Sequence, residues 1–211
     1  MRRFITRAFA VTLFVAATCA SVPFSTAQAS VPVHGVAFGA SALLQTLDPD
    51  VDAANAYCKS TGGLVEDRRP VFGTNGGQST WLYLSGHAYF CQYTSKKDGS
   101  RIHLLTTTLY TTMPTLAALA YYAKVPINSK GCPGGANPSS CYCTQLGGTD
   151  QFGGATLAGG AWVDLNSKPD TQLQTCIFPD MSSIDSWGLA YHSQGIVRGI
   201  DLSKVLRYHK K

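Results

Sequence analysis

Cysteines are the residues of this sequence whose spacing most clearly indicates chemistry. Cys58 and Cys91 are 33 residues apart, and Cys143 and Cys176 have the same separation. Equal spacing predicts one equivalent disulfide in each half of the chain, because a shared arrangement of helix and strand would place both pairs alike. Closing a loop of this length would contribute roughly 3–4 kcal/mol to the stability of a small domain.

Two further cysteines, Cys132 and Cys141, lack counterparts in the first half, where Ala56 stands at the position equivalent to Cys141. We expect these two to pair with each other, since Cys141 and Cys143 would point about 200° apart around a helix axis and need different partners. A metal site of Cys132, Cys141, Cys143 and Cys176 is the alternative, but it has no C-x-x-C spacing and no nearby histidine. The sequence therefore predicts no metal and no cofactor.

Residue types suited to acid–base catalysis are present, but no catalytic motif contains them. The sequence lacks the G-x-S-x-G elbow, the H-E-x-x-H zinc motif and a phosphate-binding glycine loop. His87, His103 and His192 fall in or near predicted strands, where a surface or hydrogen-bonded role is the simpler interpretation. Asp185, His192 and Ser193 would need a geometry that spacing does not fix in order to act as a triad. We therefore predict no catalytic residue.

A stretch that occurs twice places the cysteines on secondary structure. Residues 52–63 read DAANAYCKSTGG and residues 137–148 read NPSSCYCTQLGG, so Tyr-Cys and Gly-Gly recur 85 positions apart without a gap. Each copy predicts one short helix, because Asp or Asn caps an N-terminus well and glycine often ends a helix in the left-handed conformation. The predicted caps are Asp52 and Gly62 in the first copy and Asn137 and Gly147 in the second.

The residues that follow each predicted helix favour antiparallel strands. Leu64-Val65 begins a strand that we expect Arg68-Arg69-Pro70 to end, since proline removes a ladder donor. Residues 102–111, rich in Thr, Leu and Tyr, form the longest predicted strand. In the second half, residues 187–191 and 195–200 are predicted to complete the sheet.

Three other features concern packing. Residues 114–124 predict a connecting helix that begins at a proline and packs on both halves. The tryptophans, Trp81, Trp162 and Trp187, are interpreted as core residues rather than as a carbohydrate platform. The basic C-terminal end, residues 204–211, is interpreted as a solvated tail.

The first 29 residues predict a secretory signal peptide. Arg2, Arg3 and Arg7 form a basic segment, an apolar run follows, and Ala27-Gln28-Ala29 is typical of a cleavage site. Cleavage after Ala29 would place the protein in the periplasm or outside the cell. Lipid attachment at Cys19 is the alternative, but the residues before Cys19 lack the pattern of a lipidation site.

The charge of the mature chain narrows the class of partner. Residues 1–29 hold three of the 17 basic residues and none of the 12 acidic ones, which leaves 14 basic against 12 acidic side chains. This near neutrality argues against a nucleic-acid partner. No later segment reaches the ~18 apolar residues of a membrane helix. A protein or a component of the cell envelope is therefore the predicted partner.

The second copy resembles a known family. Asn137-Pro138, Tyr142-Cys143 and Gly147-Gly148, followed by Cys176-x-Phe178-Pro179-Asp180 and Ile184-Asp185-Ser186-Trp187, resemble a small bacterial domain of unknown function that carries a haemolysin label. The first copy is degenerate, with Tyr93-Thr94 in place of Phe-Pro, and Met181 replaces the family's turn glycine in the second. The resemblance implies an exported or envelope-attached protein, and the family offers no catalytic residues to carry over.

Together these patterns predict an α+β fold of two tandem repeats, each with one helix and a small antiparallel sheet, stapled by disulfides. The signal peptide is placed at 1–29, the first repeat at 30–113 with its core at about 50–111, the connecting helix and loop at 114–131, and the second repeat with its basic tail at 132–211.

The predicted function is that of an exported, non-catalytic binding or inhibitory module that contacts another protein or the cell envelope. The alternative is a secreted hydrolase or cell-wall-acting enzyme with a site between the repeats. That alternative expects His103 or His192 within hydrogen-bond reach of a carboxylate and a nucleophile.

Overall fold

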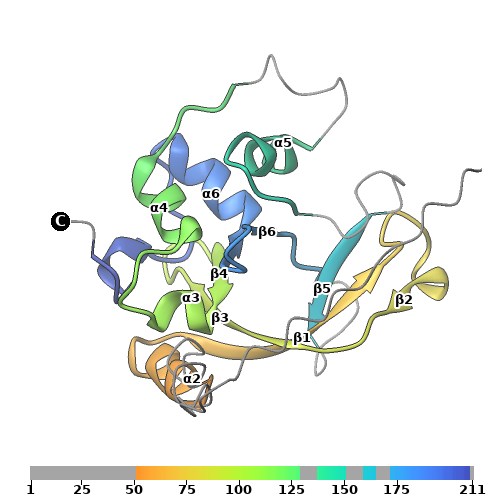
Figure 1. The fold of residues 1–211 in the computed structure, drawn as a ribbon, viewed down its shortest axis with the longest axis horizontal. Coiled ribbons are helices and arrows are strands. Elements are labelled where there is room, and N and C mark those ends of the chain that lie inside the picture. Colours follow the sequence, from red (N-terminus) through yellow and green to blue (C-terminus); the bar gives the residue numbers. More distant parts are fainter. Residues whose placement is uncertain (1–50, 129–136, 151–158, 165–171, 210–211) are drawn as a thin grey trace, which may run out of the picture. The chain divides into compact units, whose positions relative to one another are not determined.

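The computed structural model describes residues 51–128, 137–150, 159–164 and 172–209, all within the unit Gly39–Lys211. These residues form an α+β structure with an antiparallel sheet, as the sequence predicts (Figure 1). The helices are α2 (Val51–Ser60), α3 (Thr106–Tyr110), α4 (Leu116–Ala123), α5 (Pro138–Gln145) and α6 (Ser186–Ser193), with 3-10 turns η1 (Gln78–Thr80) and η4 (Leu202–Lys204). The strands are β1 (Leu64–Phe72), β2 (Leu82–Tyr83), β3 (Ala88–Thr94), β4 (Arg101–Leu105), β5 (Gly160–Asp164), β6 (Thr175–Ile177) and β7 (Ser183–Asp185).

The strands of both halves join one sheet instead of one small sheet per repeat. Their order is β2-β1-β3-β4-β7-β6, and β5 pairs with the second edge of β1. The two halves meet at two places, where Leu104 of β4 pairs with Ile184 of β7 and where β1 pairs with β5. Trp162 of β5 also exchanges two backbone hydrogen bonds with Leu173, just ahead of β6. The segment just before β6 thus pairs with β5, and β5 pairs with β1. These pairings close the sheet into a ring.

The two faces of the sheet carry different side chains, because neighbours along a strand point to opposite sides. One face bears a buried row that crosses four strands, in which Cys91 pairs with Leu104, Leu104 with Ile184 and Ile184 with Cys176. This row belongs to the main hydrophobic core, which also takes in residues of all five helices, such as Leu109 of α3 and Leu189 of α6. The other face, inside the ring, carries the polar and aromatic residues of the candidate site.

Both disulfides predicted from equal spacing are present. Cys58 of α2 bonds Cys91 of β3, and Cys143 of α5 bonds Cys176 of β6. Each bridge lies against a glycine three residues after the helix, because a Cβ on Gly63 or Gly148 would overlap the sulfur atoms. Cys141 is disulfide-bonded as well. Its predicted partner, Cys132, lies outside the described residues.

The two helices that carry these cysteines differ at their N-termini but have similar C-terminal ends. Asn137 precedes α5, and its Oδ1 accepts a hydrogen bond from the N–H of Ser139 at 3.0 Å. Asp52, in contrast, is the second residue of α2, where a carboxylate still favours the positive end of the helix. Gly62 and Gly147 both adopt left-handed φ angles, of 85° and 84°, and so end the helices without steric strain.

Strand β1 continues through Arg68-Arg69-Pro70, where the sequence predicted its end. The carbonyl of Pro70 accepts a hydrogen bond from Leu84, on the side of β2. The N and C=O of one strand residue point to the same side, so the missing N–H of Pro70 also faces β2. The pairing of Pro70 with Trp162 of β5, on the opposite side, is therefore unaffected.

One predicted strand is helical in its second part, and another is helical throughout. Residues 102–111 leave the sheet after Leu105 and form α3, which packs on α2 through an edge-to-face contact of Tyr110 with Tyr57. Residues 187–191 lie within α6, whose N-terminus is capped by Asp185 through the N–H of Gly188. Residues 195–200 form no strand. β-Propensity was the only signal for these segments, and burial against neighbouring helices outweighs it.

The predicted connecting helix is present as α4, which begins after a Thr115 cap and ends at Lys124 in the left-handed conformation. The C-terminal end up to residue 209 is packed rather than solvated. Leu202 and Leu206 are buried, and the Arg207 guanidinium lies 4.2 Å from the centre of the Tyr110 ring. Trp81, Trp162 and Trp187 are only half-buried, so the interpretation of these tryptophans as core residues is wrong.

The close approach of glycine to disulfide makes Gly148 sensitive to substitution. An added Cβ would lie 2.5 Å from the Sγ of Cys176 and 3.0 Å from that of Cys143. We expect Gly148→Ala to lower the free energy of unfolding by about 1–3 kcal/mol, as overpacking of a core does. Chemical denaturation would measure this loss.

Gly77→Ala is the matched control, because its Cβ would meet only Ser79, at 4.0 Å. Most of the cost of Gly148→Ala should disappear in a Cys143→Ala/Cys176→Ala background. An equal cost in both backgrounds would show that the sulfur atoms are not the cause.

Candidate functional site

Charged and polar side chains are buried together on the inner face of the sheet. Glu66 and Arg68 come from β1, Gln92 from β3, His103 from β4 and Asp185 from β7. Each of these residues is less than a tenth exposed. We call them the inner-face charge cluster. They meet because the register pairs Gln92 with His103 and because β7 lies next to β4.

Glu66 is the centre of this cluster. Its Oε2 accepts a hydrogen bond from the Arg68 Nε at 2.8 Å and lies 2.7 Å from the Arg68 Nη2, and its Oε1 accepts one from the Gln92 Nε2 at 2.9 Å. A buried carboxylate needs a charged partner and satisfied oxygens, and Glu66 has both. Arg68 also donates to the carbonyl of Trp162 and so connects the cluster to β5.

His103 lies between two carboxylates. Its Nε2 is 3.4 Å from Glu66 Oε2, and its Nδ1 is 3.6 Å from Asp185 Oδ2. Neither ring nitrogen has a hydrogen-bond partner among the described residues. The arrangement can orient an imidazole and balance its charge, but within the described part of the chain no hydroxyl or thiol nucleophile is hydrogen-bonded to His103.

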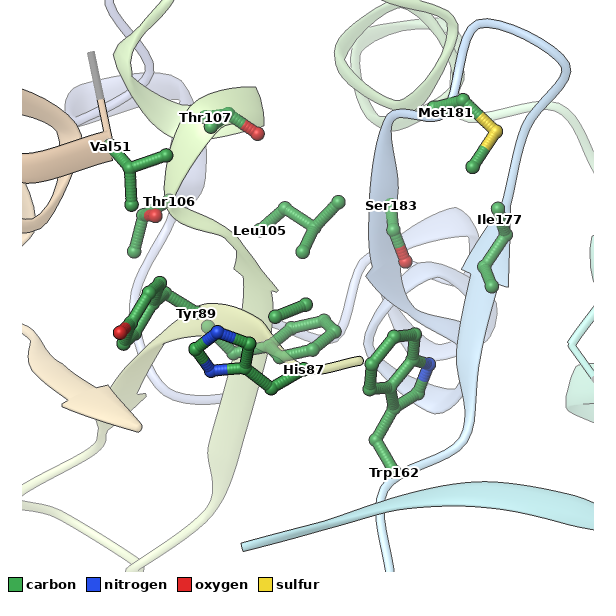
Figure 2. Close-up of a pocket in the computed structure, with 12 residues that line it drawn as sticks. Val51, His87, Tyr89, Leu105, Thr106, Thr107, Trp162, Ile177, Met181 and Ser183 are labelled. Carbon is green, nitrogen blue, oxygen red and sulfur yellow. The ribbon is translucent and has the colours of Figure 1, made fainter. Parts of the chain in front are cut away.

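An apolar pocket of about 480 Å³ lies nearby (Figure 2). Phe90, which pairs with Glu66 between β3 and β1, is one of its lining residues. The rings of Phe90 and Trp162 lie 5.3 Å apart at its base. Leu105 and Thr107, from the β4–α3 junction, face Ile177 and Met181 across it. The pocket therefore lies between the β3–β4 and β6–β7 hairpins and takes its lining from both halves of the chain. Its size and apolar lining are typical of sites that bind small molecules or apolar groups. 

Met181, on the rim of this pocket, has a strained backbone. Its φ of 62° lies in the left-handed region, and its side chain is 73% exposed. Its turn is fixed by a hydrogen bond from the Phe178 N–H to the Ser182 carbonyl. Asp180 and Ser182 additionally accept hydrogen bonds from the first N–H groups of α4. A large apolar residue is thus held in an unfavourable conformation with its side chain in solvent, a combination that points to a contact surface.

A second, polar pocket of about 320 Å³ includes the other side of His103. Asp185 and Trp187 line it from β7 and the start of α6, and Arg101 and Arg198 line it from β4 and the C-terminal segment. The Arg198 guanidinium lies 5.2 Å from the centre of the Tyr191 ring, which restrains its position. This pocket thus combines cationic, amide and aromatic groups.

The structure separates the residues of the hypothetical triad. Asp185 caps α6 and faces His103. His192 stacks on Tyr121, with ring centres 3.7 Å apart, and the Ser193 hydroxyl donates to the carbonyl of Ala190. His87 pairs with Asp67 at 2.8 Å on the surface.

Other classes of site receive no support from the described residues. No group of three or more His, Cys, Asp or Glu side chains in this part of the chain is arranged to hold a metal ion. None of the described helices is long and apolar enough to cross a membrane.

The sequence contained one signal for the charge cluster that local reasoning did not use. Glu66 is the only glutamate of the chain, and it stands two residues from Arg68 in a segment that begins as a strand. Residues two apart in a strand share a face, so an ion pair between them is readable once β1 is extended through Pro70. Met181 also had a signal, because it stands where the resembled family has a turn glycine, and glycine is the residue that favours a positive φ.

Comparisons with protein-family models, with curated proteins and with solved structures found no match for this chain.

The burial of Arg68 predicts a large effect of its substitution. Arg68→Met would leave the Glu66 carboxylate buried without its cation, and breaking a buried ion pair typically costs about 3–5 kcal/mol. The double variant Glu66→Gln/Arg68→Met should lose less, because neither charge remains. Denaturant titration of the three proteins would measure both values.

Asp67→Asn on the same strand is the control for this experiment, because Asp67 and its partner His87 are partly exposed. It should change the free energy of unfolding by no more than about 1 kcal/mol. An Arg68→Met variant as stable as the wild type would contradict the assignment of Arg68 as the counter-ion of Glu66.

Burial of His192 predicts a dependence of stability on pH. Burial lowers the pKa of His192 below its ordinary value of 6.5, Lys124 adds to this effect, and Asp201 opposes it. The folded state therefore binds a proton less readily than the unfolded state. The contribution of neutral His192 is complete above pH 6.5 and is lost as the pH falls through the folded pKa.

We expect His192→Phe, which keeps a ring against Tyr121, to flatten the fall in stability between about pH 7 and about pH 5. Thermal unfolding of both proteins across this window would measure the slope. A variant with the wild-type slope would rule out His192 as the responsible group.

Proposed function

We propose that the protein is an exported, non-catalytic binding module whose apolar pocket receives an apolar group of another protein or of a cell-envelope component. The observation that carries this proposal is Met181, an exposed apolar residue held at a positive φ on the rim of that pocket. Strain of this kind costs of order 1–3 kcal/mol and persists where the surrounding structure fixes it. A ligand in the pocket would bury the Met181 side chain, which the folded protein alone leaves exposed.

The scaffold supports binding without large rearrangement. The pocket lies between two hairpins, and each hairpin is tied to a helix by a disulfide. A preformed pocket loses little conformational freedom when it is filled, which favours affinity.

The alternative, a secreted hydrolase or cell-wall-acting enzyme, receives partial support from His103. This residue lies beside two carboxylates and lines the polar pocket. Acyl transfer or hydrolysis through a covalent intermediate would also need a nucleophile bonded to the imidazole. Among the described residues His103 has no such bond, so the geometry favours binding.

Duplication of a small domain is the origin that we propose for the fold. The equivalent disulfides support it, and so does the pairing of Leu64 with Gln92 and of Thr149 with Ile177, which differ by 85 positions on both strands. We further propose a relationship to the bacterial domain with the haemolysin label. Its support is the residue pattern around Cys143 and Cys176.

Export through a signal peptide at residues 1–29, cleaved after Ala29, completes the proposal. The disulfides fit an oxidising compartment such as the periplasm or the extracellular space.

The proposal predicts that stability and binding respond oppositely at position 181. We expect Met181→Gly to raise the free energy of unfolding by about 1 kcal/mol, because glycine adopts a positive φ without strain. The same change should weaken binding, since it removes apolar surface from the rim. Denaturation would measure the first effect.

The loss of binding can be measured with a photoreactive amino acid in place of Thr107, which lies across the pocket from Met181. Light-dependent adducts formed by the exported protein in its own envelope should decrease with Met181→Gly. They should also decrease with Ala88→Phe, which fills the pocket, but not with Thr94→Phe, an exposed position on the same face of β3.

Lys124→Gly is the matched control for strain, because Lys124 has a φ of 47° at the end of α4 and does not line the pocket. It should stabilise the fold and leave the adducts unchanged. Adducts that are insensitive to Met181→Gly and Ala88→Phe would show that the pocket is not the contact site.

A further inference from the structure

The polar pocket has a lining suited to a ligand and shares no residue with the apolar pocket. The strongest indication of a ligand is His103, which is 7% exposed, lines this pocket, and has no hydrogen-bond partner on either ring nitrogen within the described part of the chain. Its ring nitrogens lie 3.4 Å and 3.6 Å from carboxylate oxygens of Glu66 and Asp185, but neither contact has hydrogen-bond geometry. A buried imidazole always has at least one N–H to donate, and leaving it without a well-formed hydrogen bond costs free energy. A ligand in the pocket can satisfy it.

The charges around His103 indicate an acidic group on the ligand. Glu66 is neutralised by Arg68, and one oxygen of Asp185 is occupied by the N–H of Gly188 at 2.9 Å. Arg101 and Arg198, in contrast, have no carboxylate within ion-pair distance among the described residues and line the pocket. Guanidinium groups bind carboxylates and phosphates through paired donors.

The remaining lining indicates hydroxyl groups and an apolar surface. Asp185 would repel a simple anion, whereas it can accept hydrogen bonds from hydroxyls. Gln172 and Gln174 supply amides that both donate and accept. Trp187 is half-buried in the lining, with its ring centre 5.8 Å from that of Tyr191. An indole can pack against the apolar side of a ring.

We propose that the polar pocket binds an acidic sugar residue. The carboxylate would lie against Arg101 and Arg198, the hydroxyls against His103 and the glutamines, and one face of the pyranose ring against Trp187. The pocket volume of about 320 Å³ lies at the lower end of the range for ligand sites and suits one sugar residue. This site is independent of the apolar pocket and does not rest on the proposed function.

Sodium glucuronate is the probe for this proposal, with glucose and acetate as comparisons at matched ionic strength. Glucose lacks the carboxylate and acetate lacks the hydroxyls. Two-dimensional NMR of the Trp187 indole N–H and the His103 ring C–H would report binding. We expect saturable shifts with glucuronate and an affinity at least about tenfold higher than for either comparison compound.

Arg101→Gln and Arg198→Gln should each reduce the affinity for glucuronate about tenfold, while the exposed Arg69→Gln on β1 should leave it unchanged. Spectra unchanged outside the pocket would show that the variants are folded. Met181→Gly should have no effect, which separates this site from the apolar pocket.

Equal affinity for acetate and glucuronate would overturn the proposal in favour of a simple oxyanion site. Absence of saturable shifts at millimolar glucuronate would overturn it entirely.

Discussion

The two halves of this protein are joined by two strand pairings, that of β1 with β5 and, near the middle of the sheet, that of Leu104 with Ile184. Their neighbours across the flanking strands are Cys91 and Cys176, and each cysteine is bonded to a helix on the same side. The Leu104–Ile184 pair thus lies between two disulfide-bonded cysteines in one buried row. Because a shift of one residue would turn this row towards the inner face, the register between the halves is strongly specified.

The inner face depends on that register. His103 and Leu105 alternate with Leu104 on β4, and Ser183 and Asp185 flank Ile184 on β7. The same pairing that buries Leu104 and Ile184 therefore brings His103 close to Asp185 and places Leu105 opposite Ser183 across the apolar pocket (Figure 2). Both pockets take residues from the two halves. Neither half alone contains the side chains that either pocket needs.

Sequence reasoning succeeded where the relevant contacts repeat along the chain. Equal spacing identified both described disulfides, and the recurring Gly-Gly marked both helix ends. It failed where long-range packing decides the outcome. Thr106–Tyr110 has the composition of a strand, but the chain leaves the sheet there because α3 packs on α2. Pro70 looks like a strand end, yet its missing N–H faces away from β5. The pairing of β1 with β5, and with it the base of the apolar pocket, had no local signal.

The order of the cysteines has a consequence for biogenesis. Cys58 bonds the next cysteine along the chain, and so does Cys143. The predicted pair Cys132–Cys141 would follow the same rule. A chain that crosses a membrane from its N-terminus presents these cysteines one after another. An oxidase that joined each new thiol to the one before it would produce both described pairs without the help of an isomerase.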